Sequence, residues 1–166
     1  DLWPKQYKIA DKVVCVSKYC EEKTREEMNG NVNVTTCYNP IDDSRVLTLA
    51  QDLTSQENEY STLTKPLFVT VGRLSPEKGY VRLIKIMKEL SDDGFTFSLV
   101  IIGGGPDENR IREEIRNNNM QDKIFMIGPK KNPHNITSQA DCFICSSFSE
   151  GYSTACTEAA ILGIPI

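Results

Sequence analysis

The feature that most constrains the fold of this sequence is a regular alternation between short apolar runs and longer amphipathic stretches. The apolar runs begin at residues 66, 97, 123 and 140 and read PLFVTVG, FSLVIIG, KIFMIG and ADCFICSS. They are continuously apolar, which is typical of strands covered by helices on both faces. The stretches that follow three of them read EKGYVRLIKIMKELSDDG, PDENRIREEIRNNN and STACTEAAILG. Strands and helices in alternation predict the α/β class, with a Rossmann-like parallel sheet flanked by helices.

The first part of the chain carries a shorter version of the same pattern. KVVCVS at residues 12–17 predicts a buried strand, KYCEEKTREEMNG a helix that ends at Gly30, and NVNVTTC a second strand. The segment QDLTSQENEYSTLTK at residues 51–65 is polar and has no usable period. We therefore predict three regions, namely residues 1–42, a linker or insertion at 43–65, and a second domain at 66–166.

The composition narrows the functional classes. A formal net charge of −4 argues against nucleic-acid binding, which depends on clustered Lys and Arg. No apolar stretch approaches the length of a membrane span, and Asp1 begins no signal peptide. Because the chain does not start with Met, we expect a piece of a longer protein, and a targeting segment outside it stays open. A cytoplasmic location, including the inner face of the membrane, is the expectation.

The six cysteines do not suggest a disulfide framework. Cys15, Cys37, Cys142 and Cys145 stand inside apolar runs, so we expect buried free thiols in a reducing cytosol. The spacing of Cys142 and Cys145 points their side chains to opposite faces of a strand. We therefore expect no metal site there.

Four loops follow the carboxyl ends of predicted strands, where ligands bind in parallel α/β sheets. In the first of them, VGRLSPEKG, Gly72 permits a tight turn, while Arg73 and Lys78 supply two cations. A guanidinium and an ammonium at a strand end suit a diphosphate. A solvated loop with two ordinary surface charges is the alternative interpretation.

The second loop, IIGGGPDENR, resembles a dinucleotide fingerprint only in part, because Glu108 occupies the position of the third glycine. Its glycines indicate either close backbone approach to a ligand or a strand-to-helix turn with Pro106 at the first helical position. In the third loop, His134 is expected to be a solvated histidine, with a general base as the alternative.

The fourth loop leads into a helix that carries two glutamates, Glu150 and Glu158. If the helix begins near Ser153, its free N–H groups and its dipole can accept a phosphate. The carboxylates cannot bind an anion, but they can accept hydrogen bonds from hydroxyl groups. A nucleotide sugar has hydroxyls at both ends and a diphosphate between them, so it fits this set. Two exposed glutamates that the helix dipole favours are the alternative.

These motifs together resemble the retaining glycosyltransferases of family 4, which have the two-domain GT-B fold. VGRLSPEKG and SSFSEGYSTACTEAAILGIP carry the resemblance, with weaker support from ADKVVCVS, NPID, LVIIGGGP and IFMIG. It implies that residues 1–42 are the tail of the acceptor-side domain. It also implies that residues 66–166 are a nucleotide-sugar donor-binding domain, truncated at its C-terminus.

The resemblance assigns roles to individual residues. Arg73 and Lys78 match the basic pair that stabilises the departing diphosphate, Glu150 matches the residue that contacts the donor sugar, and Glu158 matches the residue that binds the ribose. The expected catalytic residues are thus Arg73, Lys78 and Glu150, without a metal or another cofactor. The expected donor-binding residues are Gly72, Gly128, Pro129, Lys130, Gly151, Tyr152, Ser153, Thr154 and Glu158.

The expected reaction is retaining transfer of a hexose-type sugar from a nucleotide-diphosphate sugar to a glycan or lipid-linked acceptor, as in polysaccharide biosynthesis. The resemblance implies that the acceptor-binding loops lie outside this chain, so we expect the chain to be inactive alone. Peripheral association of the full-length protein with a membrane is a further expectation. A non-catalytic nucleotide- or sugar-binding module stays open, as does a nucleotide-sugar epimerase that uses Glu150 and His134. The incomplete glycine pattern disfavours a NAD-dependent dehydrogenase.

Overall fold

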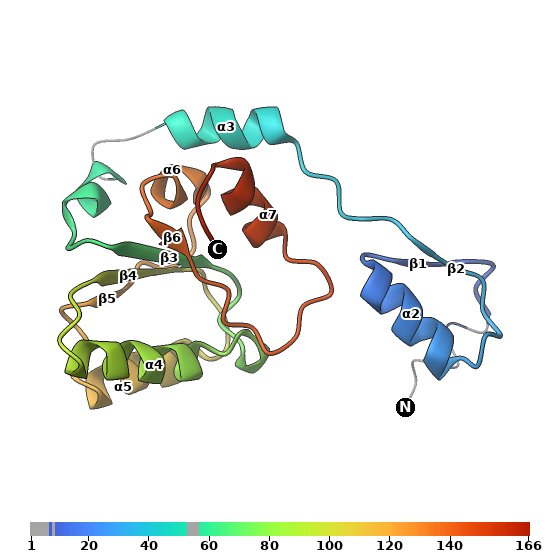
Figure 1. Cartoon of the computed structure of the whole chain (residues 1–166), viewed down its shortest axis with the longest axis horizontal. Coiled ribbons are helices and arrows are strands. Elements are labelled where there is room, and N and C mark those ends of the chain that lie inside the picture. The colour runs from blue at the N-terminus through green and yellow to red at the C-terminus, as the bar shows by residue number, and fades with distance from the viewer. Residues whose placement is uncertain (1–6, 8, 53–56) are drawn as a thin grey trace. The chain divides into compact units, whose positions relative to one another are not determined.

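The structure, a computed structural model, describes residues 7, 9–52 and 57–166, and these form two compact units (Figure 1). The first unit comprises Asp1–Ile41 together with Glu150–Thr154, within the described residues. The second comprises Asp42–Ser149 together with Ala155–Ile166. The segment Glu150–Thr154 thus belongs with the first unit although it is remote from it in sequence.

The first unit contains two parallel strands, β1 (Val13–Cys15) and β2 (Val34–Thr36), and the helix α2 (Lys18–Glu27). Ser17 caps the helix, because its hydroxyl accepts a hydrogen bond of 3.2 Å from the Cys20 N–H. The small core is formed by Cys15, Met28, Val32 and Val34. The strand predicted at residues 12–17 is present, but the prediction of complete burial was wrong.

Val14 shows why the burial prediction failed. Its side chain is 58% exposed, whereas its neighbour Cys15 is buried. Successive side chains on a strand point to opposite faces. Within the described residues of this unit, the core lies on the face of Cys15, so a continuously apolar run is only half covered.

The second unit is built on a four-stranded parallel sheet in the order β5-β4-β3-β6. The strands are β3 (Leu67–Val71), β4 (Ser98–Ile102), β5 (Ile124–Met126) and β6 (Cys142–Phe143). Each of the four apolar runs that predicted a strand contains one of them. This arrangement confirms the α/β class and the parallel sheet.

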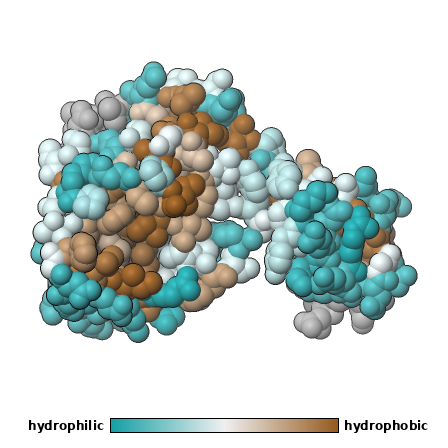
Figure 2. All heavy atoms as spheres, viewed as in Figure 1, coloured by the Kyte–Doolittle hydropathy of each residue, from teal (hydrophilic) through white to brown (hydrophobic). Residues whose placement is uncertain are grey.

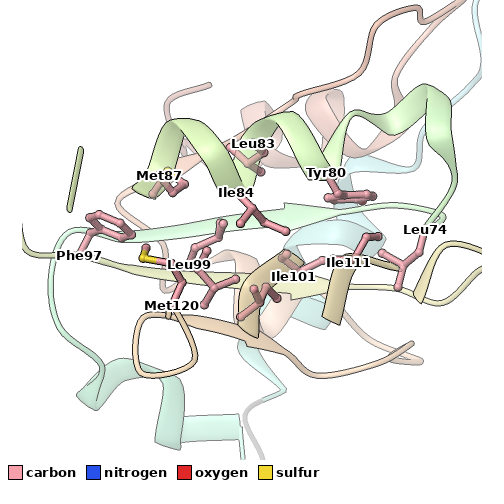
Figure 3. Close-up of a cluster of buried hydrophobic side chains, with 12 residues drawn as sticks. Leu74, Tyr80, Leu83, Ile84, Met87, Phe97, Leu99, Ile101, Ile111 and Met120 are labelled. Atoms are coloured by element: carbon pink, nitrogen blue, oxygen red, sulfur yellow. The ribbon is translucent and has the colours of Figure 1, made fainter. Parts of the chain in front are cut away.

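Helices cover both faces of this sheet (Figure 1). On one face lie α4 (Tyr80–Asp92) and α5 (Glu108–Asn117), and on the other lie α6 (His134–Thr137) and α7 (Thr154–Ile161). Strand β4 serves both layers: Leu99 and Ile101 join the cluster beneath α4 and α5, while Val100 and Ile102 join the cluster beneath α6 and α7. Figure 3 shows the first cluster, in which Leu83, Ile84 and Met87 of α4 lie over the sheet.

The space-filling view agrees with this layering. Figure 2 shows hydrophobic residues along the sheet of the second unit and hydrophilic residues on the outer side of the layer that contains α4 and α5. Helix α4 follows this pattern, since its buried residues are Tyr80, Leu83, Ile84 and Met87. The hydrophobic clusters on the two faces of the sheet together fix the positions of the strand ends.

The region predicted as a linker or insertion, residues 43–65, contains regular structure. Helix α3 (Asp43–Gln51) begins after Asp42, whose carboxylate accepts a hydrogen bond of 2.9 Å from the Arg45 N–H. A short 3-10 helix η1 (Glu57–Thr62) follows, and residues 53–56 lie outside the described part. Asp42, which caps the helix, is a sequence signal for a helix start that does not depend on a hydrophobic period.

The expectation of buried thiols holds only in part. All six cysteines are free, but Cys37 and Cys145 are exposed, and only Cys15 is buried. Cys37 and Cys145 lie just beyond β2 and β6. A cysteine one or two residues past a short strand lies outside the part of the sheet that helices cover. The apolar runs extend beyond the strands, so they predicted too much burial for these two cysteines.

The residues after α7 lie beside β6. The Phe143 N–H donates a hydrogen bond of 2.7 Å to the Pro165 carbonyl, while the Ile144 N–H donates to Val69 of β3. The last residue of β6 and the residue after it therefore donate to opposite sides.

Candidate active site

Four loops gather at one edge of the second unit, because all four strands of its sheet run parallel. They follow β3, β4, β5 and β6, as expected from the positions of the apolar runs. The carboxyl edge is where ligands bind in sheets of this type. The contacts among the loops decide what this edge can hold.

The loops after β3 and β4 are joined by backbone hydrogen bonds. The Gly72 N–H donates to the Ile102 carbonyl at 3.0 Å, and the Leu74 N–H donates to the Gly104 carbonyl at 3.0 Å. In return, the Asp107 N–H donates to the Leu74 carbonyl at 2.9 Å. These bonds continue the pairing of β3 with β4 past the ends of the strands.

The glycines of the second loop are explained by this close approach. A Cβ atom on Gly103 would lie 1.9 Å from the Gly72 carbonyl oxygen, and one on Gly105 would lie 2.3 Å from the Leu74 carbonyl oxygen. Real Cβ atoms do not come so near to a carbonyl oxygen. The structure shows a strand-to-helix turn packed on the neighbouring loop. Pro106 does not occupy the predicted first helical position, because the helix begins at Glu108 and Asp107 is its N-cap.

The loop after β6 is fastened to the turn that carries Lys78. The Ser146 hydroxyl donates to the Lys78 carbonyl at 2.7 Å, and the Phe148 N–H donates to the Glu77 carbonyl at 2.8 Å. A Cβ atom on Gly79 would lie 2.3 Å from the Ser146 carbonyl oxygen. The 3-10 turn η2 (Pro76–Lys78), which is part of the loop after β3, is thus held against the loop after β6.

The two predicted cations lie near each other on the first loop. Arg73 is exposed, and the half-buried Lys78 reaches back over Gly72, where a Cβ atom would meet its Cε at 3.9 Å. The pKa of the Glu77 carboxyl lies below its usual range, because the Ser75 hydroxyl donates a hydrogen bond of 2.5 Å and the charges of Arg73 and Lys78 add to the effect. The edge is therefore rich in positive charge with one carboxylate beside it.

A pocket of about 220 Å³ opens between the loops. It is lined by Val71, Gly72, Arg73, Ile102, Gly103, Gly104, Pro129, Lys130 and Pro133. The structure thus brings four predicted site residues to one pocket, namely Gly72, Arg73, Pro129 and Lys130. Gly128 adjoins it, since its carbonyl accepts a hydrogen bond of 3.0 Å from the Gly103 N–H, which lines the pocket.

Glu158 lies on α7 and faces His134, the first residue of α6. The Nδ1 atom of His134 is 4.0 Å from Oε2 of Glu158, and the two side chains are 13% and 28% exposed. The prediction of a solvated loop histidine was therefore wrong. The residues next to His134 in the sequence are polar and suggested a solvated position. Helix α6 packs on α3, however, and the imidazole is largely buried. His134 adjoins the pocket through Pro133.

The remaining predicted residues, Glu150, Gly151, Tyr152, Ser153 and Thr154, belong to the first unit. There the Tyr152 ring lies 5.8 Å from the Tyr38 ring, measured between centroids. A Cβ atom on Gly151 would lie 3.2 Å from Val16. Their proximity to Lys78 and Glu158 in a working site stays a prediction.

The sequence of residues 53–166 matches the family described as "Glycosyl transferases group 1". This match covers more than half of the chain. The chain belongs to this family.

Individual relatives agree with the family. An uncharacterized glycosyltransferase of Methanocaldococcus jannaschii is 31% identical over 112 residues, which are 66% of this chain and 28% of that protein. A phosphatidylinositol N-acetylglucosaminyltransferase subunit of Saccharomyces cerevisiae is 24% identical over 156 residues, which are 90% of the chain and 33% of the subunit. This group 1 glycosyl transferase chain thus spans about a third of the length of such relatives.

A solved structure shows the fold. The pneumococcal O-GlcNAc transferase, crystallised with UDP and GlcNAc, superposes with a TM-score of 0.76 at 22% identity, covering 99% of this chain and 31% of the other. Such neighbours are GT-B glycosyltransferases, so the group 1 chain has the architecture of that fold. This confirms the predicted fold class, and together with the family match it confirms the resemblance to GT-B glycosyltransferases.

Two residues of this glycosyl transferase chain that the sequence did not single out support the site. Arg82 on α4 donates a hydrogen bond of 2.7 Å to the Ser146 carbonyl, and its guanidinium lies 4.2 Å from the centroid of the Phe148 ring. Their separation of 66 positions hides the pair in the sequence. Within the described residues, no cluster of three or more His, Cys, Asp or Glu suits a metal ion.

Among the described helices, none is both long enough and apolar enough to cross a membrane.

Proposed function

We propose that the protein containing this chain transfers a hexose-type sugar from UDP to an acceptor with retention of the anomeric configuration, in the manner of family 4. The observation that carries the proposal is the carboxyl edge of the second unit, where Arg73 and Lys78 stand beside a pocket of about 220 Å³. Membership of the glycosyl transferase family supports the reaction class. A relative that binds UDP with GlcNAc, and another named for N-acetylglucosamine transfer, support UDP-GlcNAc as the first donor to test.

In this proposal each part of the donor meets a different group. The base enters beside Pro129 and Lys130, and the ribose hydroxyls donate hydrogen bonds to Glu158. Arg73, Lys78 and the N-terminus of α7 hold the diphosphate. Glu150 contacts the sugar.

The chemistry follows from charge. As the bond between the sugar and the diphosphate breaks, negative charge grows on the leaving group. Preorganised cations stabilise that charge more in the transition state than in the ground state. We propose that the basic pair does this without a metal, and that the acceptor attacks from the face that the diphosphate leaves. The acceptor is a glycan or a lipid-linked sugar, and the protein works in the cytoplasm or at the inner face of the membrane.

The basic pair provides the test. In the intact protein, Arg73→Ala and Lys78→Ala should each lower kcat with UDP-GlcNAc on the order of a hundredfold, the usual cost of one charge-stabilising group. The KM for the donor should rise by less. Lys85→Ala is the matched control, since Lys85 lies on α4 with its side chain 62% exposed and should change neither constant.

Initial rates of UDP release give kcat and KM for each variant, and the same assay with EDTA tests whether the reaction needs a metal. If the two alanine variants raise KM and keep kcat, the pair binds the ground state only and the proposed mechanism is wrong. If the protein binds UDP tightly but releases none from any UDP-sugar and acceptor pair, it is a binding module. A loss of turnover with EDTA would contradict the metal-free proposal.

A further inference from the structure

His134 is the only histidine in the sequence, and its imidazole faces the carboxylate proposed to bind the ribose. The Nδ1–Oε2 distance is 4.0 Å, which exceeds a direct hydrogen bond by roughly 1 Å. Closing this gap requires a rotation about side-chain bonds, since both backbones are held by packing and hydrogen bonds. Nδ1 carries a proton in one neutral tautomer and in the charged imidazole, so it can donate to Glu158 in both.

The backbone of His134 is fixed on two sides. The His134 N–H donates to the Asn132 side-chain oxygen at 3.2 Å, and the Asn132 amide donates to the Leu49 carbonyl of α3 at 2.8 Å. On the other side of His134, the side-chain amide of Asn135 donates to the Asp52 carbonyl, at the end of α3, at 3.0 Å. Helix α6 is thus tied to α3 on both sides of the histidine, and the backbone that carries the imidazole has a defined position.

Glu158 is fixed from the other side by its helix. Its neighbour Ala159 is completely buried, and Ala159 and Ile136 of α6 belong to the same hydrophobic cluster. Because α6 and α7 share this core, the separation of the two backbones is set by packing. What remains free is the rotation of the Glu158 side chain, which has three rotatable bonds.

We propose that His134 is a positioning residue, which holds one carboxylate oxygen of Glu158 and so presents the other to the ribose hydroxyls of UDP. This proposal rests on the proposed function, because it takes Glu158 as the ribose-binding residue. A glutamate that is already oriented loses less side-chain freedom when the nucleotide binds. Removing the orienting donor should therefore weaken UDP binding without removing any contact to UDP.

Two substitutions at position 134 separate the donor from the bulk of the ring. His134→Phe keeps an aromatic ring and removes the donor, and it should weaken UDP binding by about three- to tenfold, the effect of one ordinary hydrogen bond. His134→Asn places an amide N–H near the position of Nδ1 and should restore affinity to within about twofold of the original. In turnover assays, His134→Phe should raise the KM for the donor by more than it lowers kcat.

A double-mutant cycle tests whether His134 acts through Glu158. In a Glu158→Gln background, His134→Phe should have no further effect on UDP affinity, because the carboxylate that it orients is gone. Calorimetry with UDP on the intact protein gives all four affinities. Thermal melting checks that each variant folds, and His134→Leu, which also lacks the donor, replaces His134→Phe in the cycle if the phenylalanine variant does not.

The outcomes separate this inference from the proposed function. If Glu158→Gln weakens UDP binding but His134→Phe does not, the positioning role is wrong and the proposed function stands. The positioning role is also wrong if His134→Phe weakens binding equally in both backgrounds, or if asparagine fails to restore affinity. If Glu158→Gln itself leaves UDP affinity unchanged, the ribose assignment fails, and this inference fails with it.

Discussion

At the scale of single residues, Glu150 and Glu158 stand eight positions apart in sequence but belong to different units of the structure. Glu158 lies on α7 beside His134, whereas Glu150 opens the segment that belongs with the first unit. The family resemblance gives them different partners on the donor, namely the ribose and the sugar. Their substitutions should therefore differ in which ligand reports the change.

We predict that Glu158→Gln weakens UDP binding by about 1.5–3 kcal/mol, the usual range for hydrogen bonds to a charged group. This corresponds to roughly ten- to a hundredfold in affinity. Glu150→Gln should leave UDP affinity nearly unchanged and should affect only the intact UDP-sugar. Calorimetry with both ligands on folded variants measures this difference. Wild-type affinity of both variants for both ligands would show that neither glutamate contacts the donor.

Within the described residues of the first unit, Glu21 is a carboxylate whose pKa departs clearly from its usual value. Its pKa is lowered from 4.5 to about 2, first by a hydrogen bond of 2.5 Å from the Thr36 hydroxyl and then by one from Arg25. A lowered pKa contributes stability that is complete above the unfolded value and is lost as the pH falls through the folded value. The first unit should therefore lose stability between pH 4.5 and about 2.

Urea unfolding followed by circular dichroism across this pH range tests the prediction. Glu21→Gln should flatten the acid dependence, because the amide does not titrate in this range. Glu22→Gln, at an exposed position on the same helix, is the matched control and should keep the dependence of the original chain. Equal acid dependence in all three proteins would rule out the Thr36–Glu21 contact as its source.

At the scale of elements, two glycines are needed for two separate reasons. Gly105 leaves room for the Leu74 carbonyl, which a Cβ atom would approach to 2.3 Å. Gly94, which ends the turn after α4, has a φ of +89° and no atom within 4 Å of a Cβ position. One glycine is therefore required by crowding, and the other by backbone conformation.

We predict that Gly105→Ala costs about 1–3 kcal/mol of unfolding free energy, the range for overpacking, and that it also weakens UDP binding by shifting the first loop. Gly94→Ala should cost about 1 kcal/mol, the strain of a left-handed conformation, and should leave UDP binding unchanged. Urea denaturation and UDP calorimetry measure the two effects. If Gly105→Ala binds UDP like the original protein, the loops do not depend on one another for binding.

The elements also show how far the sequence can be interpreted. Strand β4 could be predicted because Leu99 to Ile102 are all apolar, a pattern that only a strand covered on both faces requires. The role of Gly103 could not be predicted, because its crowding comes from Gly72, which is 31 positions away. Local sequence alone does not distinguish a glycine that faces a ligand from one that faces the chain itself.

The same limit applies to the candidate site. Gly72, Arg73, Pro129 and Lys130 could be grouped in advance, because parallel strands bring their following loops to one edge. The environment of His134 could not, since Asn132 is tied to α3, which lies outside the predicted motifs. The predicted roles of all site residues await the binding and kinetic experiments.

At the scale of the whole molecule, the described residues contain separate hydrophobic cores. The first unit has a cluster that includes Met28, and the second has a cluster on each face of its sheet, with Leu99 in one of them. Among the residues that the structure describes, none belongs to the clusters of both units. A defect in one core should therefore remain in its own unit.

We predict that Met28→Ala and Leu99→Ala each destabilise their own unit by about 2–5 kcal/mol, the usual cost of emptying a buried site. Both side chains are nearly inaccessible, at 4% and 0% exposure. Hydrogen exchange with mass spectrometry should show faster exchange in β1 and β2 for Met28→Ala, and in β3 and β4 for Leu99→Ala. Faster exchange throughout the chain in either variant would mean that the units unfold together.

The hydrogen bonds among the loops after β3, β4 and β6 have a consequence for protein engineering. Leu74 donates a hydrogen bond to Gly104 and accepts one from Asp107, and Lys78 accepts one from Ser146. The backbone conformation of each loop therefore depends on that of its neighbour. Transplanting one of them from a relative with another donor preference would import a backbone that its neighbours do not fit. A change of specificity by grafting should therefore move residues 72–79, 103–107 and 144–149 as one set.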